Sequence, residues 1–322
     1  MTLAKSEKNI KQQPLCPRSE STWQKIKNDY QKNYIVIWMM TVVVAYYVIF
    51  HYAPMYGIIM AFKDFSVAKG ISGSDWVGLE HFKNFFNDIY AWRIIRNTLL
   101  LSLYHLVFGF PFPIILALLL NEVRSKFFKK TVQSITYLPH FISVVVICGM
   151  VVEFTSHSGL INDIIAMFGG ERTSFLLDQK YFRTIYTITG IWQNLGWDSI
   201  IYLAALTAVD PELYEAASID GAGRFKQFLH VTLPSILPTI IVLLILNMGK
   251  FMSQGSEKVI LLYNENTYET ADVISSFVYR RGLINADYSF STAVGLFNSL
   301  VNLLLVVSTN TLSKKFSESS LW

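Results

Sequence analysis

The residues of this chain best suited to chemistry are polar side chains placed inside long apolar stretches. A strongly polar group within a membrane-spanning helix costs roughly 2.5–3.5 kcal/mol on insertion scales, so it normally faces a protein interior or a water-filled path. Such residues fall in three groups, which are Trp192, Gln193, Asn194, Trp197 and Asp198, then Asn247, Lys250 and Gln254, and finally Asn298 and Asn302. Indole rings stack on the apolar faces of sugars and amides hydrogen-bond to hydroxyls. These residues are therefore candidates for a solute path.

The spacing of the second and third groups predicts shared helical faces. Asn247, Lys250 and Gln254 are three and four residues apart, and Asn298 and Asn302 are four apart. Residues at these intervals lie on one side of an α-helix. The asparagines have a second interpretation, in which they form interhelical hydrogen bonds worth about 0.6 kcal/mol each that hold the bundle together.

Lys250 requires an anionic partner if it is charged within a span. Asp198 is one candidate, and that pairing would be purely structural. The alternative is a carboxylate on the solute. In that case a uronic-acid oligosaccharide, such as an alginate or pectin fragment, would suit Lys250 better than a neutral one.

No residue pattern predicts catalysis, a metal centre or nucleotide binding. The six histidines show neither HExxH spacing nor clustering, and the chain has no GxxxxGK[ST] phosphate loop. Cys16 lies in a polar tail and Cys148 in an apolar run, so a disulfide between them is not expected. No basic stripe interleaved with aromatic residues favours nucleic-acid binding.

The elements that position the polar residues are predicted to be membrane helices. Of the 322 residues, 52% are hydrophobic and 16% charged, whereas soluble domains carry nearer a quarter charged residues. This composition predicts an all-α integral membrane protein. About 20 mainly apolar residues are needed to cross the hydrocarbon core, and six stretches qualify, at roughly 34–53, 98–120, 136–155, 184–206, 235–255 and 289–311. At 53–62, Pro54 and Gly57 are expected to break the apolar stretch and leave it on the outer surface.

The distribution of lysine and arginine predicts the orientation. An even number of spans places both termini on one side. With the termini inside, the segments 1–33, 121–135, 207–234 and 312–322 contain 15 of the 27 Lys and Arg residues, in agreement with the positive-inside rule. We therefore predict a cytoplasmic tail at 1–33, a six-span domain at 34–312 and a second cytoplasmic tail at 313–322.

The cytoplasmic loop at 207–234 predicts a short surface helix followed by a turn. Asp210 is a favourable N-cap and Pro211 a favourable first helical residue. Gly221 and Gly223 permit a sharp change of direction, including positive φ. A surface helix with small residues on one face suits a groove in another protein. The alternative is a simple re-entry loop, which Pro and Gly alone would explain.

This loop resembles the signature of binding-protein-dependent ABC importer permeases. That signature is Glu-Ala-Ala, three residues, Gly, nine residues, Ile, any residue and Leu-Pro. Here Glu215, Ala216, Ala217, Gly221, Val231, Leu233 and Pro234 match every spacing, with Val in place of Ile. The segments Gly196–Leu206 and Tyr288–Asn298 and the closing residues 318–322 are most similar to the carbohydrate branch, particularly permeases for oligosaccharides and polysaccharide fragments. The resemblance extends from about residue 34 to the end.

The resemblance implies a type I importer fold, in which the loop forms a coupling helix that docks into a cytoplasmic ATPase. Glu215 would pair with a basic residue there, Ala216 and Ala217 would seat the helix, and Gly221 would permit the turn. Asp220, Arg224 and Pro234 belong to the same candidate coupling segment.

The resemblance also implies the partners. These are two ABC ATPase subunits, a second permease (with a heterodimer favoured) and an extracytoplasmic solute-binding protein in a bacterial inner membrane. The chain itself would carry no cofactor, because ATP and Mg are bound by the ATPase.

Other transport classes remain as alternatives. An ion-coupled secondary transporter could use Asp198 and Lys250 for coupling, although the 215–234 signature argues against it. A membrane scaffold without its own pathway, or an ABC permease for amino acids or phosphate, is a further possibility.

Overall fold

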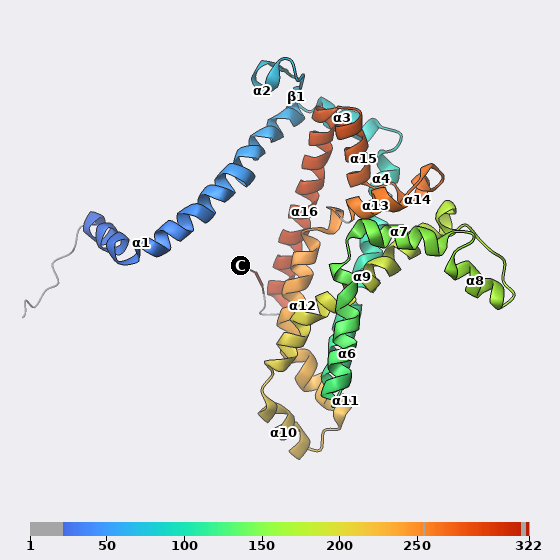
Figure 1. The fold of residues 1–322 in the computed structure, drawn as a ribbon. Helices are drawn as coiled ribbons and strands as arrows, with labels where there is room; N and C mark the ends of the chain where they lie inside the picture. Colours follow the sequence, from blue (N-terminus) through green and yellow to red (C-terminus); the bar gives the residue numbers. More distant parts are fainter. Residues whose placement is uncertain (1–21, 254, 317–319, 322) are drawn as a thin grey trace, which may run out of the picture. The chain divides into compact units, whose positions relative to one another are not determined.

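The computed structural model describes residues 22–253, 255–316 and 320–321 and is predominantly helical (Figure 1). Its two-residue strands β1 (Lys63–Asp64) and β2 (Asp75–Trp76) pair antiparallel, with Lys63 opposite Trp76. The chain divides into two compact units, Met1–Ile58 and Ile59–Trp322. Each unit is considered by itself.

The first unit contributes a long apolar helix. It contains α1 (Thr22–Tyr47) and the π-helix η1 (Val48–Tyr52), and the 3-10 helix η2 (Ala53–Phe62) begins at its end. The stretch Tyr30–Phe62 is long and apolar enough to span a membrane, and its apolar window is not buried within the chain. The predicted break at Pro54 and Gly57 is wrong. Helical structure continues to Phe62, because a proline in the first turn of a helix needs no N–H partner.

The second unit is a chain of helices separated by short turns. Its elements after β1 are α2 (Gly70–Gly73), α3 (Glu80–Asn87), α4 (Ala91–Tyr104), η3 (His105–Gly109), α5 (Pro111–Glu122), α6 (Lys126–Tyr137), η4 (Leu138–Phe141), α7 (Val144–Thr155), α8 (Leu160–Met167), η5 (Phe175–Leu177), α9 (Gln179–Thr207), α10 (Pro211–Ile219), α11 (Arg224–Gln227), η6 (Phe228–Thr232), α12 (Leu233–Met248), η7 (Phe251–Ser253), α13 (Ser256–Leu262), η8 (Glu265–Thr267), α14 (Tyr268–Ala271), α15 (Ile274–Tyr279), η9 (Arg280–Ile284) and α16 (Tyr288–Phe316).

Side-chain caps define where several of these helices begin. Ser125, Ser143 and Asp178 precede α6, α7 and α9, and each accepts a hydrogen bond from a backbone N–H of the first turn. Such caps satisfy donors that have no partner within the helix. The start of each helix is thus encoded locally.

Within the described residues, five stretches are long and apolar enough to cross a membrane. They are Tyr30–Phe62, Ala91–Glu122, Val144–Met167, Arg224–Met248 and Tyr288–Lys315. The predicted stretch at 184–206 lies within α9, a continuous helix of 29 residues, but its polar residues keep it out of this set. The number of crossings therefore stays a prediction.

Two predicted boundaries are wrong. The sequence predicts a third stretch at 136–155. In the structure α6 ends at Tyr137, a 3-10 turn containing Pro139 follows, and α7 begins only at Val144. The chain leaves helical geometry at Ile142 (φ −80°, ψ 135°), and Ser143 then caps α7. The fifth stretch was extended to 255, but α12 ends at Met248.

The long helix α9 lies at the centre of the second unit. It packs against α5, α6 and α12, and its buried residues belong to two apolar clusters. Phe182 and Tyr186 join a cluster with α7 and α13, whereas Tyr202 and Leu206 pack with α5 and α12. A third cluster joins α4, α15 and α16. Because α9 is held along its length, its polar residues have defined surroundings.

Candidate solute path and coupling helix

The predicted surface helix is present as α10. The Asp210 side chain accepts a hydrogen bond from Glu212 N at 2.9 Å, Pro211 is the first helical residue, and the helix ends at Ile219. Of the two glycines that follow, Gly221 has φ +75° and Gly223 has φ −69°. Gly221 alone of this pair therefore uses the left-handed conformation that favours glycine.

Side-chain hydrogen bonds hold α10 against the helices that follow it. Tyr214 Oη and Thr232 Oγ1 are 3.0 Å apart, which joins α10 to η6. Gln227 Nε2 donates to Ser218 Oγ at 2.8 Å and to Ala222 O at 3.0 Å. These bonds set the angle of α10 relative to α11 and η6, at the end of the unit opposite α3 and α15 (Figure 1).

The residues predicted to contact an ATPase lie mainly on the surface. Glu215, Ala216, Asp220, Gly221, Arg224 and Pro234 are exposed, and Ala217 is half-buried. Sequence reasoning missed two large apolar side chains beside them, Ile219 and Phe225, of which Ile219 is 87% exposed. Leu213 of α10 is exposed as well. Exposed apolar groups grouped in this way indicate a surface for another protein.

A cavity of about 460 Å³ brings together residues of α9, of α12 and of the turn that follows α12. It is lined by Asp198, Asn247 and Lys250, with His105 of η3 and Tyr202 among its other walls. Within the described residues, Asp198 and Lys250 form no ion pair at 4.0 Å or less. The structural pairing considered from sequence is therefore absent here, and both charged groups face the cavity.

The prediction that Asn247 and Lys250 lie on one continuous helix is wrong. Only Asn247 lies in α12, because the helix ends at Met248 and Lys250 follows in a turn. Gln254 lies outside the described residues. The remaining two residues meet at the cavity through this turn.

The end of α12 is held by residues distant in the chain. The Asn302 side chain of α16 accepts from Met252 N at 2.8 Å through Oδ1 and donates to Ser253 Oγ at 3.0 Å through Nδ2. Ser102 of α4 donates to the Phe251 carbonyl. Both ends of the Asn302 amide are thereby used to hold η7, as interhelical bonding would require.

The aromatic and amide residues of α9 do not converge on the Lys250 cavity. Trp197 stacks on His140 with 4.4 Å between ring centroids, and Asn194 Oδ1 lies 3.1 Å from His140 Nδ1. Gln193 is buried, whereas Trp192 is 45% exposed. Within the predicted α9 group, only Asp198 lines that cavity.

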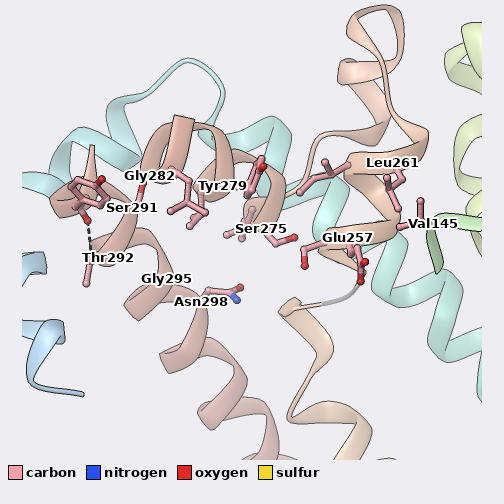
Figure 2. Close-up of a pocket in the computed structure, with 16 residues that line it drawn as sticks. Val145, Glu257, Leu261, Ser275, Tyr279, Gly282, Ser291, Thr292, Gly295 and Asn298 are labelled. Atoms are coloured by element: carbon pink, nitrogen blue, oxygen red, sulfur yellow. Dashed lines mark hydrogen bonds between the residues drawn. The ribbon is translucent and has the colours of Figure 1, made fainter. Parts of the chain in front are cut away.

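A second cavity, of about 710 Å³, was not foreseen. It is bounded by α13, α15, η9 and α16, and Figure 2 shows Glu257, Ser275, Tyr279, Ser291 and Asn298 around it. Asn298 is the one predicted path residue in its lining. The cavity is assembled from segments without a common sequence pattern, so no sequence signal identified it.

A buried ion-pair network outside the predicted spans was also missed. The Asp272 side chain is fully buried and accepts hydrogen bonds from Arg280 Nη1 at 2.9 Å and Nη2 at 2.6 Å. Arg93 Nη2 lies 3.6 Å from the same carboxylate. Burial alone would lower the pKa of Arg280, but the hydrogen bonds to Asp272 and Tyr263 raise it above its ordinary value. The guanidinium therefore remains charged.

No group of three or more His, Cys, Asp or Glu side chains in the described ranges could hold a metal ion. The lining of the Lys250 cavity offers charged and hydrogen-bonding groups for binding a solute.

Comparisons with known proteins point to one family. Residues 109–318 match the model of the family described as binding-protein-dependent transport system inner membrane component. A relative from Bacillus subtilis, the polygalacturonan/rhamnogalacturonan transport system permease protein YteP, is 48% identical over 86% of this chain and 87% of its own length.

Two solved structures are also similar. A permease chain of a bacterial ABC transporter involved in the import of the acidic polysaccharide alginate is 44% identical, with a TM-score of 0.85 over 91% of this chain and 99% of that chain. A chain from a bacterial alginate ABC transporter in complex with an alginate pentasaccharide-bound periplasmic protein is 43% identical, with a TM-score of 0.86 over 92% and 100%.

Proposed function

Because this chain belongs to the family of binding-protein-dependent transport system inner membrane components, we propose that it is one of two permeases that together import an acidic oligosaccharide.

Family membership confirms the resemblance inferred from the 215–234 signature. The chain is a permease subunit of an ATP-driven ABC importer with the type I permease fold, in the inner membrane. It is a transport subunit rather than an enzyme, and in such systems the ATPase is a separate subunit.

The observation that carries the acidic substrate is the position of Lys250. Its side chain lines a cavity with Asn247 and Tyr202 and has no carboxylate within 4.0 Å among the described residues. An ammonium group in such surroundings is stabilised by an anion that enters the cavity. Asp198, in the same cavity, would accept hydrogen bonds from sugar hydroxyls. The names of the similar proteins, which concern polygalacturonan and alginate, support the same substrate class.

In this proposal α10 transmits the motion of the ATPase. Two ATPase subunits bind ATP and Mg and close together, and α10 moves with the subunit in which it docks. Glu215 pairs with a basic residue there, and Leu213, Ile219 and Phe225 add apolar contact. A second, different permease completes the path, an extracytoplasmic binding protein delivers the sugar, and both termini are cytoplasmic. The similar transporter solved with a saccharide-bound periplasmic protein supports the delivery step.

The ion-coupled alternative would also use Asp198 and Lys250, since both line the cavity and neither forms an ion pair with another described residue. It predicts uptake driven by a proton or sodium gradient without ATPase subunits. Family membership favours ATP-driven uptake.

The test is uptake by the complete complex reconstituted in vesicles with its loaded binding protein. Acidic and neutral oligosaccharides of equal length are compared in the unsubstituted complex and in the Lys250→Ala and Lys250→Arg variants. Loss of one charge pair is expected to slow acidic uptake by about tenfold, which is about 1.4 kcal/mol in the rate-limiting barrier, and Lys250→Arg should restore much of it. Neutral uptake should change less than twofold. An equal loss for both sugars in Lys250→Ala would remove the argument.

A further inference from the structure

The 710 Å³ cavity is open to its surroundings and has the size of a small-molecule site. Ligand pockets typically occupy about 300–1,000 Å³ and combine apolar walls with a few polar groups. The walls here include Ile260, Leu261 and Val278, and the polar groups come from α13, α15 and α16. Figure 2 shows Leu261 and the polar residues Glu257, Ser275, Ser291 and Asn298 around one space.

Two buried polar atoms of the lining have no hydrogen-bond partner among the described residues. They are Ser291 Oγ and Asn298 Oδ1. The Asn298 amide is anchored through its other end, because Nδ2 donates to Ser253 Oγ at 3.1 Å. An unsatisfied buried polar atom costs about 1–3 kcal/mol. A ligand with hydroxyl groups could donate to both atoms and remove that cost.

The charge of the lining selects against a carboxylate at this position. Glu257 is the one carboxylate among the lining residues, and none of them is a lysine or arginine. A carboxylate repels another anion, but it accepts hydrogen bonds readily from hydroxyls. Tyr279 adds a ring that can cover the apolar face of a sugar. The lining therefore suits an uncharged, polyhydroxylated group.

A short element connects this cavity with the one that contains Lys250. Ser253, in η7, donates its N–H to Lys250 O at 3.0 Å, and its Oγ accepts from Asn298. Lys250 lines the first cavity and Asn298 lines the second. Ser253 thus links a lining residue of the first cavity, Lys250, to a lining residue of the second, Asn298.

We propose that the cavity of α13, α15 and α16 is a second saccharide subsite, which binds the hydroxyl groups of one sugar unit through Glu257, Ser291 and Asn298. A neighbouring unit of the same chain then places its carboxylate at Lys250. This inference rests on the proposed function and adds that the two cavities bind different groups. The Lys250 cavity binds the carboxylate of one sugar unit, and the second cavity binds the hydroxyl groups of another. It also explains why a chain of several units, rather than a single sugar, would be transported.

Gly295 provides a direct test because it lines the cavity and a Cβ atom added there meets no atom within 4 Å. Gly295→Trp should fill the cavity without displacing the backbone, and Gly295→Ala is the matched control. In reconstituted vesicles, Gly295→Trp is expected to slow uptake of an acidic pentasaccharide at least tenfold. Uptake of the disaccharide of the same uronate, which needs only the Lys250 cavity, should change less than twofold, as should both rates in Gly295→Ala.

A labelling experiment keeps the test independent of how Gly295→Trp folds. Thr292→Cys, in a chain that also carries Cys16→Ser and Cys148→Ala, places a thiol in the cavity lining. The pentasaccharide-loaded binding protein should slow modification by a membrane-impermeant thiol reagent at least fivefold, whereas the disaccharide should not.

Each contrary result has a distinct meaning. Equal effects of Gly295→Trp on both sugars, no effect on either, or labelling that the pentasaccharide leaves unchanged would overturn the second subsite alone. A cross-link from Thr292→Cys to the second permease would do the same, because the cavity would then be a subunit interface. If the unsubstituted complex takes up no acidic saccharide, the proposed function fails and the subsite fails with it.

Discussion

Replacing the buried carboxylate of Asp272 should destabilise the protein more than replacing an exposed carboxylate of the same ion-pair network. Asp272 accepts two hydrogen bonds from Arg280 and one from Ser276 Oγ at 2.7 Å, with no part of its side chain exposed. Asp272→Asn keeps the shape but leaves the Arg280 guanidinium, 23% exposed, without a counter-charge. Breaking one side of a buried ion pair costs about 3–5 kcal/mol. Because Arg280 has a raised pKa, deprotonation cannot relieve this cost.

The matched control is Glu269→Gln in the same network. Glu269 pairs with Arg96 at 3.0 Å and with Arg93 at 3.5 Å, but its side chain is 51% exposed. Ion pairs that are exposed to solvent in this way contribute about 0–1 kcal/mol to stability. Thermal unfolding of the assembled complex in lipid nanodiscs should show a midpoint lowered by at least about 6 °C for Asp272→Asn and by much less for Glu269→Gln. Equal shifts in the two variants would refute the assignment of a buried pair.

Two further pairs of variants test close geometry. Gly221→Val should lower the amount of sugar imported per ATP hydrolysed at least tenfold, because valine at φ +75° is strained and alters the path of the chain after α10. The control Gly223→Ala, at φ −69°, should keep the rates of uptake and of hydrolysis within twofold. Full coupling in Gly221→Val, measured as sugar imported per phosphate released, would count against the role of this turn. Gly196→Ala should reduce the yield of assembled complex, because its Cβ would collide with the Thr136 carbonyl where α6 contacts α9. The control Gly149→Ala, in α7, should be tolerated because its Cβ meets nothing within 4 Å. Equal yields by size-exclusion chromatography would contradict this.

The coupling loop could be predicted in detail because its signals are local. Asp210 caps a helix that begins at the next residue, and Gly221 supplies the positive φ within the same segment. Neither feature needs a partner more than a few residues away. The exposed side chains of Ile219 and Phe225 were missed, since exposure depends on what the rest of the chain covers.

The arrangement of the solute path could be predicted only in part. Helical periodicity predicts that Asn247 and Lys250 lie on one face of a helix. In the structure α12 ends at Met248, before Lys250, and the backbone N–H of Met252 donates to the side chain of Asn302, fifty residues away in sequence. The turn nevertheless brings Lys250 beside Asp198 at one cavity. The turn that joins Asn247 to Lys250 depends on this distant contact, so the sequence pattern does not contain it.

The sequence by itself determined that this is a membrane protein of the permease family, and where α10 begins and the chain turns after it. These depend on composition and on interactions between near neighbours, which operate wherever the segment lies. The tertiary structure decided which polar groups face a shared space, that Asp198 and Lys250 stay apart, and that Glu257 and Asn298 line a second cavity. A cavity exists only where helices from distant parts of the chain fail to fill the volume between them, and that depends on their packing.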